Sequence, residues 1–141
     1  MPNRFVAAGA AMLALAGLAA CTPKPQSPVS GSATVTVNGD DAHMNAVKCT
    51  QMDWFQTIHI GGDFAKATIV VDQRSLPATA TSVHIQNLGG FTGQYSKGDG
   101  SDAADMSVSG DRFTITGTAN GYKTDKPNEP ASARFKIVAT C

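Results

Sequence analysis

Three cysteines are the residues whose side chains could carry covalent chemistry in this chain. Cys21 follows Leu18, Ala19 and Ala20, and this order of a leucine, two small residues and a cysteine looks like a bacterial lipobox. There the thiol can carry a diacylglyceryl group, and the amine freed by the signal peptidase can be acylated, for example with palmitate. Because one acyl chain holds a protein at a membrane only marginally, we expect two or three chains on Cys21. The alternative is an ordinary cleaved signal in which Cys21 has no such role.

The segment before Cys21 is typical of an export signal. Residues 1–4 are polar and contain one cation, Arg4, and residues 5–18 form an uncharged run of mostly apolar residues. A transmembrane helix needs about 20 apolar residues, whereas the apolar part of a secretory signal needs only about 7 to 15. We therefore predict that residues 1–20 are a lipoprotein signal peptide and exclude them from the fold.

Cys49 and Cys141 are the two cysteines that remain for the folded part. Two thiols in an exported protein most simply form one disulfide, which would close a loop of 92 residues. On the chain-entropy model such a loop contributes about 4 to 5 kcal/mol to stability. The alternative is a pair of free, buried cysteines. In either case their role is structural.

The composition excludes several classes of function. The 141 residues carry 11 Lys and Arg against 11 Asp and Glu, so the chain has no net charge and no basic footprint for nucleic acid. It contains no Gly-x-Ser-x-Gly and no His-Glu-x-x-His sequence. We predict one small domain that is not an enzyme and that has no cofactor and no nucleic-acid partner.

Two groups of residues could begin a metal site. His59 and His84 have the outward parity of predicted strands, and a carboxylate such as Asp63 or Asp72 could join them to bind a metal or to support hydrolysis. Solvent-facing histidines are the simpler interpretation, because two scattered ligands do not make a site.

The second group is the loop 97–105, in which three aspartates accompany two glycines. Carboxylates in such a loop could hold Ca²⁺, but the spacing is not that of an EF-hand. A plain hydrophilic loop is the simpler interpretation, and we predict no metal site.

These residues must be positioned by β-strands. Residues 21–34 are rich in Ser, Thr and Pro and predict an extended tether, whereas residues 35–141 form the predicted folded domain. Alternating apolar residues begin at Ala33, and the pattern places Trp54 on the same inward face as Ile58 and Ile60. Further runs occur at 33–37, 47–49, 67–71, 83–86, 91–96, 106–109, 113–118 and 133–141. We predict a small all-β domain, an antiparallel β-sandwich or open barrel of about 7–8 strands with one disulfide.

From Cys49 to Cys141 the chain resembles the mycobacterial LpqH-type lipoprotein antigen family. The resemblance is carried by a Val-x-Cys-Thr segment, an Ile-x-Ile-Gly-Gly turn, Asn-Leu-Gly and Gly-x-Tyr sequences, the segment Ile-Thr-Gly-Thr-Ala and the closing strand; these lie at 47–50, 58–62, 87–89, 93–95, 115–119 and 135–141.

The resemblance implies an exported protein at the extracytoplasmic face of the cell membrane, anchored through Cys21, with Cys49 and Cys141 in a disulfide. It also implies an acylated N-terminus that host innate immune receptors can recognise and a tether that can be mannosylated. We therefore expect a surface antigen or interaction module. The alternative is a small-ligand-binding lipoprotein with a cleft between the sheets, which would need a pocket of about 300 Å³ or more with convergent polar groups.

Overall fold

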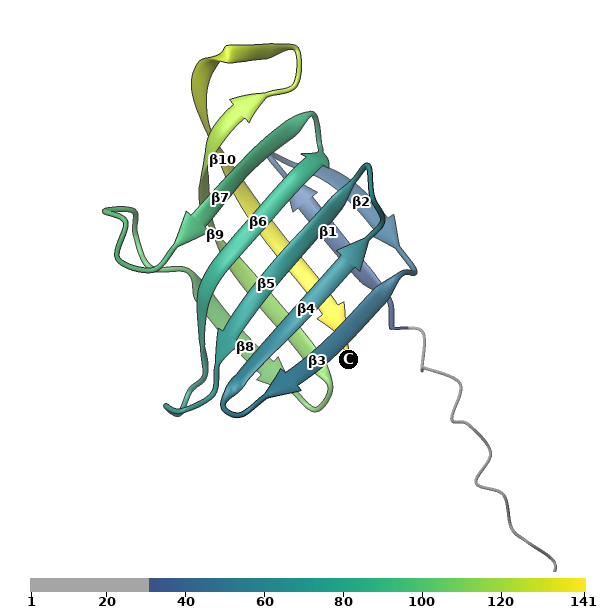
Figure 1. Ribbon diagram of the computed structural model, residues 1–141, viewed down its shortest axis with the longest axis vertical. Helices are drawn as coiled ribbons and strands as arrows, with labels where there is room; N and C mark the ends of the chain where they lie inside the picture. The colour runs from purple at the N-terminus through teal and green to yellow at the C-terminus, as the bar shows by residue number, and fades with distance from the viewer. Residues whose placement is uncertain (1–30) are drawn as a thin grey trace, which may run out of the picture.

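The computed structural model describes residues 31–141, which form ten antiparallel β-strands and no helix (Figure 1). The strands in chain order are β1 Ala33–Val37, β2 Asp40–Met44, β3 Val47–Met52, β4 Phe55–Gly61, β5 Lys66–Asp72, β6 Thr79–Leu88, β7 Phe91–Ser96, β8 Asp105–Ser109, β9 Arg112–Lys123 and β10 Lys126–Thr140. The all-β prediction is confirmed. The expected number of strands was too low, and β2 is missing from the sequence pattern because its residues, Asp-Asp-Ala-His-Met, are mostly polar.

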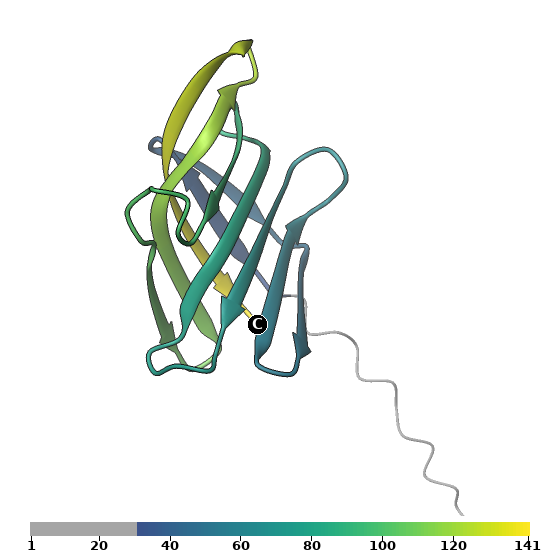
Figure 2. The same ribbon diagram turned by 60° about the vertical axis from the view of Figure 1, so that its left-hand side comes forward.

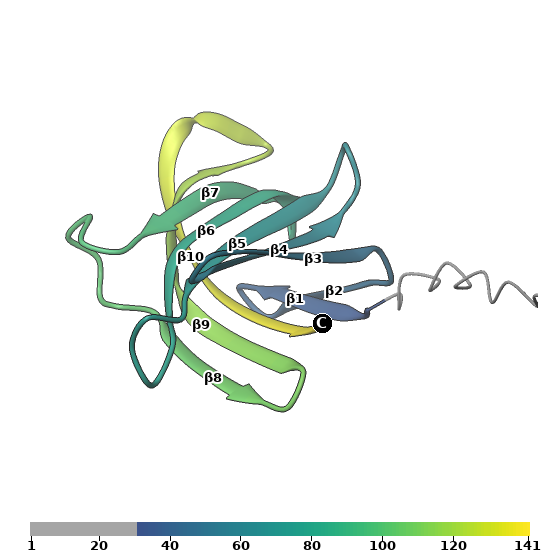
Figure 3. The ribbon, with the colours of Figure 1, turned by 60° about the horizontal axis from the view of Figure 1, so that its bottom comes forward.

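All ten strands belong to one sheet, so the open barrel, rather than the sandwich, describes the fold. Hydrogen bonds connect the strands in the order β2-β1-β10-β9-β7-β6-β5-β4-β3, and β8 pairs with β9 beside this path. The sheet curls until its first and last strands approach each other (Figure 3). β2 and β3 are the two ends of the path and are not paired with each other, although they are consecutive in the chain and are linked by residues 45–46. We call the gap between these two ends of the sheet the seam.

The core lies inside the curled sheet and is made by the inward half of each alternating strand. Fully buried side chains include Ile58 and Ile69 from neighbouring strands, and each buried side chain of this size contributes about 1.5 to 3 kcal/mol. No polar or charged residue of the described chain is buried except the tyrosine Tyr95. The Tyr95 hydroxyl oxygen accepts a hydrogen bond from the Ala104 N–H at 3.0 Å, so its polar atom is satisfied.

Trp54 does not lie on the inward face with Ile58 and Ile60, so that prediction is wrong. β3 ends at Met52 and β4 starts at Phe55, which leaves Asp53 and Trp54 as a two-residue turn. Asp53 has a left-handed backbone (φ 52°), as a tight hairpin turn of this length requires. The turn removes Trp54 from the alternation of the strand, and its side chain is 62% exposed.

The longest hairpin, β9–β10, reaches beyond the rest of the barrel (Figure 2). Its register shifts between Lys126 and Pro130, so β10 is irregular close to the β9–β10 turn. Within the sheet, β9 also pairs with β7, and Gly93 lies opposite Gly121. A Cβ on Gly121 would lie 2.0 Å from the Thr92 carbonyl oxygen, so only glycine allows the two strands to approach this closely.

Candidate functional site

The described chain begins beside the point where it ends. Ala33 pairs with Ala139, and the Thr140 N–H donates a hydrogen bond to the Ser32 carbonyl oxygen at 3.0 Å. The Cys141 N–H donates to the Asp111 carbonyl oxygen in the β8–β9 turn. We call this end of the barrel, with the β3–β4 turn, the β5–β6 loop and the β8–β9 turn, the disulfide end; these turns lie at the bottom of Figure 1.

A disulfide joins Cys49 to Cys141 across the seam. Its Cα atoms are 5.9 Å apart, and the bond closes 92 residues of chain. Cys49 lies on the edge strand β3, and Cys141 directly follows β10, two strands that are not hydrogen-bonded neighbours. The predicted single disulfide is therefore present, and it links two strands of the sheet that are not paired directly with each other.

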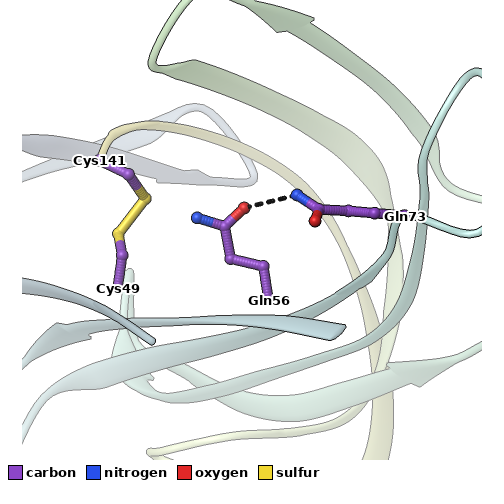
Figure 4. The surroundings of a disulfide bond; sticks show 4 residues. All are labelled: Cys49, Gln56, Gln73 and Cys141. Atoms are coloured by element: carbon purple, nitrogen blue, oxygen red, sulfur yellow. Dashed lines mark hydrogen bonds between the residues drawn. A yellow bond between two sulfur atoms is a disulfide. The ribbon is translucent and has the colours of Figure 1, made fainter. Parts of the chain in front are cut away.

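Three glutamines fill the mouth of the barrel beside the disulfide. The Gln51 side-chain amide donates to the Gln73 side-chain oxygen at 2.9 Å and to the Asp53 carbonyl oxygen at 2.8 Å. The Gln73 amide donates in turn to the Gln56 side-chain oxygen at 3.0 Å, and Figure 4 shows Gln56 between Gln73 and the disulfide. Because amides do not titrate, this network orders two loops but supplies no acid or base.

Large apolar side chains project from the same end. Met52 is 78% exposed, Trp54 62% and Leu76 96%, and Phe55 is also exposed. We call these four residues the apolar tip. The β3–β4 turn, which carries Met52, Trp54 and Phe55, is tied to the β5–β6 loop because the Gln73 N–H donates to the Trp54 carbonyl oxygen at 2.8 Å. Two loops that this hydrogen bond links thus carry large exposed apolar side chains.

An ion pair shapes the β5–β6 loop beside the tip. The Arg74 Nε donates to both carboxylate oxygens of Asp72, at 3.0 and 3.1 Å, and the Arg74 backbone N–H donates to the same carboxylate. These hydrogen bonds lower the pKa of Asp72 to about 2. The Arg74 guanidinium also lies 5.1 Å from the centre of the Phe55 ring. The carboxylate and the guanidinium bind each other within the loop, so the role of this ion pair is structural.

The two candidate histidines point outward, as predicted, but they do not meet. His59 pairs with Thr68, and Thr68 pairs with His84, so a whole strand separates the imidazoles. Within residues 31–141, no three His, Cys, Asp or Glu side chains gather closely enough to hold a metal ion. Asp63 and Asp72 therefore do not complete a site with these histidines.

The acidic loop between β7 and β8 is organised by one of its own aspartates. The Asp99 carboxylate accepts hydrogen bonds from the Ser101 N–H at 2.9 Å and from the Ser96 N–H at 3.2 Å. These backbone hydrogen bonds lower the pKa of Asp99, and the bond from Ser101 has the largest effect. Asp102 and Asp105 do not join Asp99 in a metal-binding group in the described part of the chain. The loop is best described as a hydrophilic turn closed by Asp99.

An open groove of about 570 Å³ lies on the outer face of the sheet, over β5, β6, β7 and β9. Its polar lining includes Lys66, His84, Gln94 and Asn120, and Tyr122 forms one side. Sequence reasoning gave the outward parity of His84 but missed the groove. The missing information was the pairing of β7 with β9, which places Gln94 opposite Asn120 although the two lie far apart along the chain.

The candidate lipidation residue, Cys21, and the predicted signal peptide lie outside the residues that the structure describes. Within residues 31–141, no helix long and apolar enough to cross a membrane is found.

Comparisons with known proteins support the resemblance seen in the sequence. The family model described as Mycobacterium 19 kDa lipoprotein antigen matches residues 26–141. A putative lipoprotein of Mycobacterium avium subsp. hominissuis is 57% identical over 100% of this chain and 97% of its own length. The probable lipoprotein LppE of Mycobacterium tuberculosis is 32% identical, with both chains covered completely. The lipoprotein LpqH of the same species is 32% identical over 76% of this chain and 67% of its own.

Proposed function

The chain belongs to the Mycobacterium 19 kDa lipoprotein antigen family, and we propose that it is anchored by acyl groups on Cys21 and displays its barrel as a surface antigen or interaction module. The family match carries this proposal. In it, residues 1–20 are removed as a signal peptide, and the barrel lies at the extracytoplasmic face of the cell membrane. The barrel is non-catalytic, and the acylated N-terminus is the part that host innate immune receptors recognise.

The disulfide end supports a role in display. Gly31, the first described residue, lies against Thr140 and Val47, so the predicted tether joins the barrel where β3, β10 and the disulfide meet. A pull on the tether reaches the fold at a point that a covalent bond reinforces. The long β9–β10 hairpin extends from the other end of the barrel, where an envelope or host partner can reach it.

Intact mass spectrometry of the detergent-extracted native protein tests the anchor. The expected mass is that of residues 21–141 plus one diacylglyceryl and one acyl group, minus two hydrogens for the disulfide. The Cys21→Ala variant should leave the membrane fraction in detergent-free fractionation. A native protein without lipid, or a Cys21→Ala variant that stays bound, would contradict the proposal. Added hexose units would show that the predicted tether, residues 21–34, is glycosylated.

A second candidate function is favoured by the outer groove. Its volume exceeds the roughly 300 Å³ that a small-ligand site needs, and the amide side chains of Gln94 and Asn120 and the imidazole of His84 line it. It lies outside one curled sheet, so it differs from the cleft between two sheets that the sequence suggested. Most of its accessible lining is apolar, with amide and imidazole side chains at a few positions, so it suits a small ligand that has an apolar face and a few polar groups.

Native mass spectrometry of the extracted protein tests this second candidate. A small molecule bound in the groove should be released by Gln94→Trp, because the larger side chain fills the space. Lys48→Trp is the matched control, since Lys48 is exposed on β3 and does not line the groove. Equal loss of the small molecule from both variants, or no bound molecule in the native protein, would count against ligand binding.

A further inference from the structure

We propose that the apolar tip, formed by Met52, Trp54, Phe55 and Leu76, inserts into the interfacial layer of the membrane that carries the acyl anchor. The barrel then sits on the lipid surface with its disulfide end down and does not swing freely on its tether. This inference rests on the proposed lipid anchor and adds a second point of membrane contact to it.

The first argument is that these large apolar side chains are exposed, although the core of the same fold buries other large aromatic side chains. Tyr95 and Phe91 are almost fully buried, whereas the only tryptophan of the chain projects from a turn. Leu76, on the neighbouring loop, is 96% exposed. The two loops are joined by a backbone hydrogen bond, and exposed apolar side chains carried on such linked loops mark an interaction site more often than scattered ones do.

The second argument is that the tip is held in shape before it meets any partner. The Gln73 N–H ties its loop to the Trp54 carbonyl oxygen, and the Gln73 side chain bonds to Gln51 and Gln56. The hydrogen bonds between Arg74 and Asp72 fix the β5–β6 loop that carries Leu76. Little conformational entropy is therefore lost when the tip enters an apolar layer.

The third argument is the distance from the anchor. Gly31 lies at the disulfide end and is ten residues after Cys21, and ten residues span at most about 35 Å when fully extended. A domain of this size has a radius of gyration of about 13 Å. The barrel therefore stays within about one domain diameter of the lipid. Such a short connection gives an effective concentration in the millimolar range, so a weak preference for lipid is enough to dock the tip.

The fourth argument is the chemistry of the tip. Tryptophan and other large apolar side chains, flanked by polar groups, are favoured at the boundary between acyl chains and headgroups. A stable protein complex usually involves about 20 to 30 residues on each side. Four side chains on two loops are too few for that, but they suffice for contact with a membrane to which the protein is already attached.

Trp54 supplies the experiment, because it is the single tryptophan of the sequence. The lipidated protein is reconstituted into phosphatidylcholine vesicles with and without bromine on the upper acyl chain, and tryptophan emission is recorded. We expect emission shifted to shorter wavelength than that of the Cys21→Ala protein in buffer, and at least a twofold loss of intensity with brominated lipid. Met52→Ser with Leu76→Ser should remove most of this quenching.

The matched control moves the tryptophan to the other end of β4. In the double variant Trp54→Phe with Phe64→Trp, the indole lies on the β4–β5 loop, where Phe64 is 79% exposed. This variant should co-sediment with the vesicles but show water-like, unquenched emission. If the original protein co-sediments and Trp54 is no more quenched than a tryptophan at position 64, the inference is overturned and the anchor stands. If the protein does not co-sediment with the vesicles, the proposed lipid anchor is contradicted, and the inference that rests on it is overturned as well.

Discussion

The two ends of the barrel differ in what holds them and in what they expose. The disulfide end has a covalent bond between Cys49 and Cys141, a network of three glutamines and the apolar tip. At the other end, which we call the hairpin end, the β9–β10 hairpin carries an exposed ion pair between Lys126 and Glu129 at 3.9 Å. One end is cross-linked by the disulfide and exposes the apolar tip, whereas the other exposes a charged hairpin.

This difference shows where the fold depends on its covalent and polar links. An exposed ion pair contributes about 0 to 1 kcal/mol, whereas removal of a native disulfide from a small secreted domain costs about 2 to 5 kcal/mol. The disulfide, which is the stronger of these two links, lies at the end of the barrel where it crosses the seam. β2 and β3 are not paired with each other, and the disulfide is a covalent link across the gap between them.

Removal of the disulfide should have the largest effect on stability. The double variant Cys49→Ser with Cys141→Ser is expected to lose about 2 to 5 kcal/mol, because the seam opens and the unfolded chain gains freedom. For a domain of this size we expect the melting temperature to fall by about 10 °C or more. Thermal unfolding of the detergent-extracted protein, followed by circular dichroism, measures the change.

The hairpin end provides the control for that experiment. Lys126→Ala and Glu129→Ala should each change the unfolding free energy by less than about 0.5 kcal/mol, since both side chains are exposed. If the ion-pair variants melt as early as the disulfide variant, the two ends do not differ in the way the structure indicates.

The glutamine network should give the next largest effect. In Gln73→Ala, the half-buried Gln56 loses a donor and Gln51 loses an acceptor, while the backbone bond from position 73 to Trp54 can persist. We expect a loss of about 1 to 2 kcal/mol in urea unfolding. Glu129→Ala is again the control at the hairpin end. An unchanged unfolding midpoint for Gln73→Ala would mean that water replaces the network without cost.

Sequence periodicity predicted the elements whose side chains face a core, but it did not predict the shape of the sheet. The alternation in β1 and β5, and the inward parity of Cys49, follow directly from burial on one face of a strand. Whether the strands form one curled sheet or two stacked sheets depends on pairings between distant segments, such as β1 with β10. Local patterns contain no such information, so both architectures were compatible with them.

The features of the proposed sites escaped the sequence for related reasons. Trp54 has the parity of an inward residue, and only the left-handed turn at Asp53 removes it from the strand. The glutamine network joins three strands or loops that are neighbours only in the folded sheet. The outer groove depends on the pairing of β7 with β9. In each case the decisive fact is a contact, or a turn geometry, rather than a residue type.

The smallest expected effect is a pH dependence that arises at the disulfide end. Hydrogen bonds from the Arg74 side chain, and then from its backbone N–H, lower the pKa of Asp72 from 3.8 to about 2, so the folded state binds the proton of Asp72 less tightly than the unfolded state does. The stability that this pair adds is therefore complete above pH 4 and is lost as the pH falls from about 4 to about 2. The pair is exposed, so the change should be much smaller than that of the disulfide variant.

Melting temperatures of the native protein and of Asp72→Asn, measured between pH 6 and pH 2, isolate this contribution. The native protein should be the more stable of the two at pH 6, and the difference should shrink below pH 4. Asp125→Asn at the hairpin end is the control, because Asp125 lies in the β9–β10 turn, away from Arg74. A difference between native protein and Asp72→Asn that stays constant to pH 2 would show that Arg74 does not hold the Asp72 carboxylate, and the β5–β6 loop would then lack the ion pair that shapes it beside the apolar tip.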